Sequence, residues 1–385
     1  MSDVSIAGPH NVLEMFLHSI IIRGMDSPLP PIPRKGRGAV GNRAGRYEPV
    51  TREQIDDGWW RAEELPPLST TVTDEACRSV ISRNTSPDVP FERSINPYRG
   101  CEHGCVYCFA RPTHAYLGLS PGLDFETKLF AKPDAPRLLA EELRKPGYRP
   151  RPIMLGANTD PYQPVERQRR LTRGILEVLA EFRHPVAIAT KSALVVRDLD
   201  ILAPMAEQRL VSVGLSVTSL DPGLARIMEP RASTPGKRLA AVRALSEAGV
   251  PVAVMTAPLI PFINDHELEH ILEAASAAGA SGANYVLLRL PLELKELFGE
   301  WLEAHFPDRA ARVLGRLRDC RDGQLYVAAW GTRMSGSGDY ARLLAQRFAI
   351  ACRRLGLAHG SPAARSLDCS RFRVPPKAGE QLGLF

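Results

Sequence analysis

The chain has 385 residues, of which 44% are apolar, so it is long enough for one large or two ordinary domains with a sizeable core. Its formal net charge of +6 is compatible with an anionic partner such as nucleic acid. The same charge is equally compatible with a basic enzyme that binds no nucleic acid. Its 7 cysteines are an odd number, and three of them crowd into one short loop, which argues against a disulfide framework.

The N-terminal part of the chain is predicted to lie outside the core. The apolar stretch at 12–22 is short and carries Glu14 and His18, so we predict neither a signal peptide nor a membrane span, and the cytoplasm is the expected compartment. Residues 1–50 are predicted to form a flexible basic arm, with a contact to phosphates as the functional alternative. Residues 51–90 are interpreted as a lead-in segment that covers one edge of the core.

A loop with three cysteines carries the strongest chemical signal. Cys101, Cys105 and Cys108 are spaced C-x3-C-x2-C, and thiolates favour iron–sulfur clusters, zinc or copper(I). A structural zinc site needs four ligands, usually as two pairs, and His103 would complete it awkwardly in so short a loop. Three thiolates on a [4Fe–4S] cluster would leave one iron open to a substrate or cofactor. The cluster is therefore the favoured interpretation, and a zinc knuckle stays an alternative.

Predicted strands and helices alternate after this loop. The strands are expected at 152–157, 185–190, 210–217, 250–258 and 283–290, and the helices at 134–144, 171–182, 198–207, 235–249 and 265–279. With one strand just ahead of Cys101, this makes about six βα units, which indicates a parallel sheet with right-handed crossovers. Residues 91–295 are therefore the predicted core. Residues 296–375 form a mainly helical subdomain that closes its open side, with helices at 294–317 and 340–355 and a strand at 324–330.

The cysteine loop, with Tyr107 before its third cysteine and Phe109 after it, resembles the radical S-adenosylmethionine (SAM) superfamily. The resemblance implies a partial (β/α)6 TIM-like barrel with an N-terminal arm and a helical C-terminal extension, whose chemistry lies at the carboxyl ends of the strands. It also implies a [4Fe–4S] cluster on the three cysteines and SAM on the fourth iron. Reductive cleavage of SAM would then give a radical that abstracts hydrogen from a substrate. An external electron donor, flavodoxin or ferredoxin-like, is implied as a partner.

Polar residues follow the predicted strands where SAM would bind in such a barrel. The oxygen atoms after the second strand suit the SAM ammonium group, and a lysine after the third strand suits its carboxylate. A helix cap or Asx turn is the alternative for the residues after the second strand. The expected SAM contacts are Asn158, Thr159, Asp160, Lys191, Ser192, Ser216 and Arg231.

Within the superfamily, residues 90–295 resemble the spore photoproduct lyases. The resemblance rests on the cysteine loop, Thr-Asp-Pro at 159–161, Thr-Lys-Ser at 190–192 and Glu-Pro-Arg…Pro-Gly-Lys-Arg-Leu at 229–239. In those lyases a cysteine near the end of the second strand returns a hydrogen atom to the product radical, and Ala157 occupies that position here. Tyr107 and Tyr98 are therefore the predicted catalytic hydrogen donors, with Tyr162 as a further candidate. The expected enzyme is a lyase-like relative with a different substrate or product.

The C-terminal tail, residues 376–385, ends in a short motif. Residues Gln381 to Phe385 resemble the clamp-binding peptide of bacterial DNA repair and replication proteins, which implies a sliding clamp as partner and DNA as substrate. The expected reaction is hydrogen abstraction from a substrate such as a damaged base, which would have to leave the DNA stack. Two alternatives stay open: a radical SAM enzyme that acts on RNA or protein, and a non-catalytic metal-binding nucleic-acid module.

Overall fold

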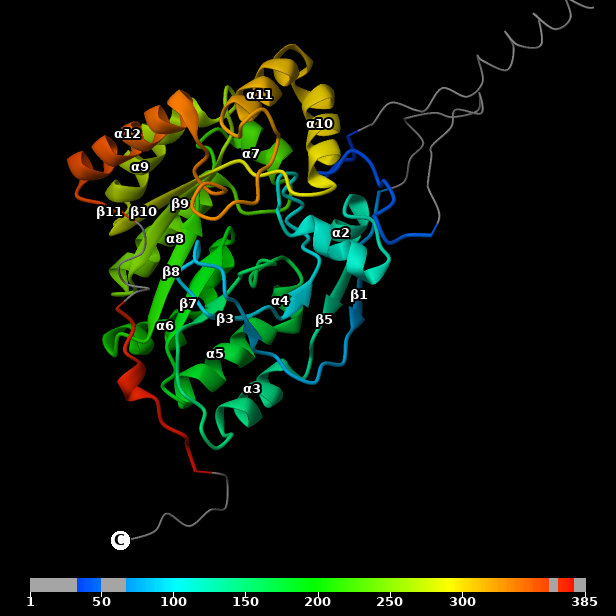
Figure 1. Ribbon diagram of the computed structural model, residues 1–385. Coiled ribbons are helices and arrows are strands. Elements are labelled where there is room, and N and C mark those ends of the chain that lie inside the picture. The colour runs from blue at the N-terminus through cyan, green and yellow to red at the C-terminus, as the bar shows by residue number, and fades with distance from the viewer. Residues whose placement is uncertain (1–32, 50–66, 360–365, 377–385) are drawn as a thin grey trace, which may run out of the picture.

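The computed structural model describes residues 33–49, 67–359 and 366–376 (Figure 1). The apolar stretch at 12–22 and the predicted clamp-binding peptide at 381–385 lie outside these residues. In the described ranges, none of the helices combines the length and hydropathy that a bilayer crossing requires.

One large sheet organises the molecule, with the strand order β11-β10-β9-β8-β7-β6-β3-β2. These strands are β2 (Ser82–Arg83), β3 (Arg93–Ile95), β6 (Ile153–Leu155), β7 (Val186–Thr190), β8 (Val211–Ser216), β9 (Val252–Leu259), β10 (Gly282–Leu287) and β11 (Ala358–His359). Every pair from β3 to β11 is parallel, whereas β2 is antiparallel to β3. The six strands β3 to β10 are the predicted βα units, so the partial (β/α)6 barrel is confirmed.

Helices cover the outer side of this sheet (Figure 1). They are α3 (Ala135–Leu143), α5 (Leu171–Glu181), α6 (Leu199–Glu207), α8 (Pro235–Glu247), α9 (Leu268–Ala277) and α12 (Gly338–Leu355). Each buries an apolar stripe at helical spacing, such as Ile175 and Leu179 of α5, against strand residues such as Ile188. Shorter helices lie in the connections: α4 (Glu166–Arg169), η3 (Ala193–Asp198), α7 (Pro222–Met228), η4 (Asp265–Glu267) and η5 (Cys369–Arg371).

A second, small sheet interrupts the barrel between β3 and β6. It has the order β1-β5-β4, with β1 (Thr71–Asp74), β4 (Tyr98–Arg99) and β5 (Lys128–Ala131). The three-cysteine loop, residues 100–110, leaves β4 and leads through η2 (Arg111–Leu117) and α2 (Leu123–Thr127) back to β5. The small sheet therefore anchors both ends of the segment that contains the cysteines. The sequence patterns did not predict it.

The prediction of a strand at 324–330 was wrong. The predicted helix at 294–317 is divided into α10 (Leu294–His305) and α11 (Pro307–Asp319), because Phe306 leaves the helical conformation and Pro307 begins a new helix, and turns rather than a strand follow α11. Asp322 and Gly323 have positive φ angles of 52° and 81°, and the backbone N–H of Gln324 bonds back to the carbonyl of Arg321 at 3.0 Å. No described strand pairs with residues 324–330, so the pattern there forms no ladder. The strand that extends the sheet beyond β10 is β11, whose two residues carry too weak a pattern to predict.

The segment at 331–334 connects the two edges of the barrel, at β3 and at β10. The backbone N–H of Leu287 in β10 donates to the carbonyl of Met334 at 2.9 Å. On the other side, Gly331 donates to Asp88 at 2.8 Å, and Arg333 forms an ion pair with the same carboxylate at 2.5 Å. Because Asp88 precedes β3, this segment ties the last strand of the barrel to the loop before the first strand. It lies in front of β9 and β10, in orange, in Figure 1.

The prediction of a flexible arm was wrong for residues 33–49. The backbone N–H groups of Gly38 and Ala39 donate to the carboxylate of Glu126 at 2.9 and 2.8 Å, and Arg37 donates to its carbonyl at 3.0 Å. A Cβ on Gly38 would lie 1.7 Å from the carbonyl oxygen of Gly104, so this segment packs directly on the cysteine loop. A buried acid far along the chain orders a segment that composition alone marks as solvated.

Candidate active site

The three cysteines lie on a loop that the rest of the fold holds in place. Cys101 and Cys105 are buried, Cys108 is half-buried, and all seven cysteines are free thiols. Backbone hydrogen bonds fix the loop at both ends: the N–H of Cys101 donates to Phe125 at 2.9 Å, and that of Val106 donates to Met228 at 3.1 Å. The loop is therefore clamped between α2 and the end of α7.

Arg111 supports the cysteine loop through a buried ion pair and hydrogen bonds to the loop backbone. It is fully buried and pairs with Glu126 at 2.5 Å. The same guanidinium donates to the carbonyl oxygens of Gly104 at 3.0 Å and Cys105 at 2.8 Å. Because a buried charge is tolerated only when it is paired and fully hydrogen-bonded, this pair fixes the loop backbone between two cysteines.

Glu229 links the loop to the barrel from the other side. Its carboxylate, which is 2% exposed, accepts hydrogen bonds from the hydroxyl groups of Tyr107 and Thr218, the latter at 2.9 Å, and pairs with Arg238. Arg238 also donates to the carbonyl of Ser216, the last residue of β8, at 3.2 Å. The motif at 229–239 is thus an ion pair that joins the β8 end to the cysteine loop.

Asp160 makes the third link, at the end of β6. Its carboxylate accepts from the Thr190 hydroxyl and the Lys191 backbone N–H, both at 2.7 Å, and lies 3.3 Å from Nδ1 of buried His103. Burial opposes its ionisation, but His103 and these hydrogen bonds lower the pKa of Asp160 to about 2. Asp160 is therefore an ionised link between β6, β7 and the loop.

Two amides complete the support of the loop. Gln163, which is fully buried, accepts from the N–H of Glu102 at 2.9 Å and donates to the carbonyl of Gly100 at 3.2 Å. Asn96 accepts from the N–H groups of Asn158 and Thr159 at 2.9 and 3.4 Å. The first half of the loop therefore has a fixed position relative to the β6 end.

Several of the predicted SAM contacts are engaged with the protein itself. The Thr159 hydroxyl donates to the carbonyl of Tyr98 at 2.8 Å, and the Ser192 hydroxyl caps η3 by accepting from Leu194 at 3.2 Å. Arg231 pairs with Glu102 at 3.1 Å. These interactions give the three side chains structural roles at the ends of the barrel strands.

The remaining predicted contacts keep their polar groups available. In the described part of the chain, the side-chain oxygen and nitrogen atoms of Asn158 and Ser216 make no hydrogen bond. The ammonium group of Lys191 lies 5.7 Å from the ring centroid of Tyr107. These three residues follow or end β6, β7 and β8, and the structure brings them to the edge of the sheet that carries the cysteine loop.

The two predicted hydrogen donors lie in different surroundings. Tyr107 is part of the cysteine loop, and its hydroxyl donates to Glu229. Tyr98 is fully buried in β4, and its hydroxyl donates to Glu166 at 2.5 Å. Burial and the Glu166 charge raise the pKa of Tyr98 well above its usual range. Only Tyr107 belongs to the loop that holds the cysteines.

Sequence reasoning missed the residues that hold the loop, which are Arg111, Glu126, Gln163, Glu229 and Arg238. Two of them stand inside the Glu-Pro-Arg…Pro-Gly-Lys-Arg-Leu motif, so that motif contained the signal. The others carry no local pattern, because their partners are distant in the sequence.

The donor set fits a cluster better than a single ion. Burial raises the pKa values of Cys101 and Cys105, so thiolates form here only with a compensating cation. A zinc site needs four convergent ligands, whereas a cluster takes each thiolate on a different iron.

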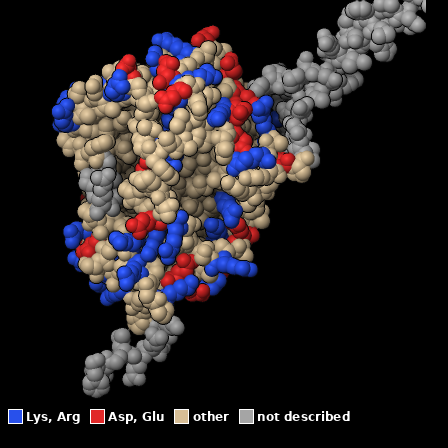
Figure 2. All heavy atoms as spheres, viewed as in Figure 1, with Lys and Arg blue, Asp and Glu red and all other residues tan. Residues whose placement is uncertain are grey.

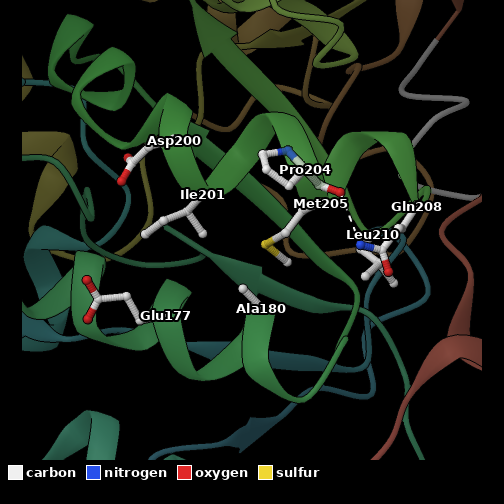
Figure 3. A pocket seen from close by; sticks show the side chains of 8 residues that line it. All are labelled: Glu177, Ala180, Asp200, Ile201, Pro204, Met205, Gln208 and Leu210. Atoms are coloured by element: carbon white, nitrogen blue, oxygen red, sulfur yellow. Dashed lines mark hydrogen bonds between the residues drawn. The ribbon is translucent and has the colours of Figure 1, made fainter.

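A hollow with a volume of about 330 Å³ lies between α5 and α6. Figure 3 shows the side chains that line it: Glu177, Ala180, Asp200, Ile201, Pro204, Met205, Gln208 and Leu210. Leu210 directly precedes β8, so this hollow reaches the amino end of that strand. The cysteine loop lies at the carboxyl ends, where parallel barrels place their chemistry. The hollow is therefore separate from the candidate active site.

Comparisons with known proteins agree with this architecture. The model of the Radical SAM superfamily matches residues 95–275. An uncharacterised protein of Mycobacterium tuberculosis is 40% identical over 239 residues, which are 61% of this chain and 70% of that protein. An uncharacterised protein of Methanocaldococcus jannaschii is 27% identical over 215 residues, 56% of this chain and 76% of that protein.

Solved structures share the fold. Spore photoproduct lyase complexed with dinucleoside spore photoproduct superimposes with a TM-score of 0.52 at 15% identity, covering 75% of this chain and 81% of that chain. A variant of the same lyase with bound AdoMet and dinucleoside spore photoproduct gives the same TM-score, identity and coverage.

An open parallel barrel with three cysteines at the carboxyl ends of its strands defines a metallocluster enzyme. The chain belongs to the radical SAM superfamily, and it is a radical SAM enzyme. Membership assigns it a [4Fe–4S] cluster and SAM as cofactors, and with them the need for an external electron source.

Proposed function

We propose that Cys101, Cys105 and Cys108 hold the [4Fe–4S] cluster and that this chain abstracts hydrogen from a damaged base in DNA. The observation that carries the first part is the loop itself. Its three cysteines stand within eight residues, and buried ion pairs on both sides fix its backbone. A cluster needs ligands that keep their position when the iron changes charge, and this loop has that rigidity.

Asn158, Lys191 and Ser216 are the residues proposed to hold SAM. They follow or end β6, β7 and β8 and keep polar groups available in the described part of the chain. An ammonium group such as that of Lys191 pairs with a carboxylate, and an amide or hydroxyl oxygen accepts from an ammonium group. When bound, the cluster supplies the electron that cleaves SAM. The other predicted contacts would shape this binding site without contacting SAM through their polar groups, which are engaged within the protein. They are Thr159, Asp160, Ser192 and Arg231.

Tyr107 is the proposed hydrogen donor of the two predicted tyrosines. Its hydroxyl stands in the cysteine loop and is already oriented by Glu229. Tyr98 is the weaker proposal, since its hydroxyl points to Glu166 in a fully buried cluster. In both cases the phenolic O–H donates a hydrogen bond to a carboxylate, so the tyrosine would release that bond and transfer the O–H hydrogen as an atom to the product radical, which leaves a tyrosyl radical.

DNA as substrate is supported by the fold that this chain shares with spore photoproduct lyase, whose solved complexes contain a dinucleoside photoproduct. The seven free cysteines favour a reducing compartment, for which we propose the cytoplasm with a flavodoxin or ferredoxin-like electron donor.

The test is anaerobic reconstitution with iron and sulfide, followed by reductant and SAM. We expect the wild-type protein to bind about four irons and to form 5′-deoxyadenosine, and Cys105→Ala to lose the product. Cys369→Ala is the matched control, because Cys369 is a half-buried free thiol in η5, and it should retain both cluster and product. Equal product from Cys105→Ala and wild type would refute the assignment.

A further inference from the structure

We propose that four residues, Phe109, Arg289, Trp330 and Arg333, form a platform that binds a single strand of DNA beside the cysteine loop. In this platform, Trp330 stacks on a base and Arg289 binds a phosphate. The inference rests on the proposed function, because it names where that DNA substrate is held.

Arg289 is a half-buried cation on which the charge of Asp88 acts, but that carboxylate forms its ion pair with Arg333. It follows β10, and its guanidinium lies 5.0 Å from the ring centroid of Phe109, the residue after Cys108. In the described residues, no carboxylate forms an ion pair with Arg289. Burial lowers the pKa of Arg289, yet a guanidinium keeps its proton in proteins. A half-buried guanidinium without an ion pair of its own can accept an added anion, and a phosphate oxygen is the anion that a strand of nucleic acid offers.

Trp330 is an exposed aromatic ring that the protein holds in place. Its side chain is 58% exposed, although large aromatic side chains are usually covered. The guanidinium of Arg333 lies over the ring, 4.3 Å from its centroid, while more than half of the residue stays exposed to solvent. The turn is anchored by the bonds of Gly331 and Arg333 to Asp88. A rigid stacking surface binds with little loss of side-chain entropy.

The four side chains form one continuous row. Phe109, 46% exposed, contacts Arg289, and Arg333 covers Trp330. The two halves meet at Arg321, whose guanidinium donates to the carbonyl of Leu288, the neighbour of Arg289, at 2.7 Å and to the carbonyl of Arg333 at 3.2 Å. Alternating guanidinium groups and exposed rings are the features that single-stranded nucleic acids require, since bases stack and phosphates pair. Phe109 places one end of the row at the cysteine loop, where the reactive base would have to lie.

A single strand fits this row better than a duplex. On the face in Figure 2, groups of Lys and Arg are interspersed with groups of Asp and Glu around a largely uncharged centre. A duplex would need a broad basic surface that meets many phosphates. A single strand needs only an aromatic ring on which a base stacks and a cation that binds a phosphate. A base of a single strand is also already out of the duplex stack, so it can reach the cysteine loop.

The experiment measures fluorescence anisotropy of a labelled deoxyoligonucleotide of about 12 nucleotides with the full-length, reconstituted protein at fixed salt. We expect Trp330→Ala and Arg289→Ala each to weaken binding about tenfold, while Trp330→Phe retains most of it. Arg137→Ala is the control, because it removes an equal charge from α3 outside the row. Affinities of the two alanine variants within about twofold of wild type would overturn the platform, and so would tighter binding of the matching duplex or RNA.

Thermal unfolding of each variant checks that it is folded. Arg289→Ala breaks no ion pair with a described residue, so it carries the test even if Trp330→Ala does not fold. Formation of 5′-deoxyadenosine by the wild type is measured in parallel. A protein that cleaves SAM but binds no strand overturns the platform alone. A protein whose binding depends on Trp330 and Arg289 but that leaves SAM intact supports the platform and contradicts the proposed function.

Discussion

Single carboxylates decide how the cysteine loop is held. Glu126 binds Arg111 and the backbone around Gly38 on one side of the loop. Glu229 binds Tyr107 and Arg238 on the other side. Both acids are buried, so each is tolerated only with its full set of partners. The loop that would bind iron is therefore fixed by charges that never touch the iron.

Replacing Glu229 with Gln tests this at the residue scale. The change keeps the size of the side chain but leaves the buried guanidinium of Arg238 without its counter-ion. We expect the free energy of unfolding to fall by about 3–5 kcal/mol, measured by denaturant titration of the protein without cluster. Glu141→Gln, at an exposed ion pair on α3, should cost less than about 1 kcal/mol. Similar losses for both variants would show that the Glu229 pair contributes no more than a surface pair.

The helices and strands follow the sequence pattern wherever their neighbours along the chain are also their neighbours in space. Alternating apolar strands and amphipathic helices are the βα repeat, and each predicted unit forms. The strand predicted at 324–330 does not form because a strand needs a partner, and no described strand pairs with this segment. The two-residue strand β11 forms because the edge of β10 offers a partner that no local pattern records.

The junction of α5 and β7 carries a buried histidine that should make stability depend on pH. His184 is fully buried, contacts the Tyr148 hydroxyl at 2.8 Å and packs edge-on against Phe372. Burial lowers the pKa of His184 to about 4. A lowered pKa means that the unfolded chain takes up the proton first, so stability is complete above pH 6.5 and falls as the pH drops toward 4.

The expected loss between pH 7 and pH 4 is about 3 kcal/mol from this residue. His184→Gln keeps a hydrogen-bonding group but cannot titrate, so denaturant titrations should show a shallower dependence on pH in this range. His270→Gln, at an exposed site on α9, should retain the wild-type dependence. An unchanged slope in His184→Gln would mean that other groups cause the acid instability.

At the scale of the whole molecule, three distant segments meet at the cysteine loop. Residues 33–49 pack on it from the N-terminal side, and the ends of β6, β7 and β8 reach it from the barrel. The region after β10, to which the segment at 331–334 bonds, reaches it through Arg289, whose guanidinium lies over the ring of Phe109. Disturbing one distant segment should therefore disturb the loop.

Gly38→Ala tests that coupling. The added Cβ would lie 1.7 Å from the carbonyl oxygen of Gly104, so the N-terminal segment or the loop must move. We expect a lower melting temperature and faster loss of iron from the reconstituted protein. Gly299→Ala makes the same change in α10, where no atom lies within 4 Å, and should stabilise the protein by up to about 1 kcal/mol. Equal melting temperatures for Gly38→Ala and wild type would contradict the close approach.

The sequence by itself determined the barrel, the three cysteines and the polar residues at the strand ends. Periodicity of 2 and 3.6 residues and a short motif are local properties, and the forces behind them act between near neighbours along the chain. The motif at 229–239 was also visible, although its meaning as the Glu229–Arg238 pair was not.

Only the tertiary structure decided how the loop is held and which strand-end groups stay available. Asp160 and Thr159 stand at the predicted position but are engaged within the protein, whereas Asn158, in the same stretch, keeps its polar group available. The ordered segment around Gly38 and the tie between Arg333 and Asp88 depend on charges that are far apart in sequence. Burial sets the cost of leaving such charges unpaired, and burial is a property of the folded chain rather than of any stretch of it.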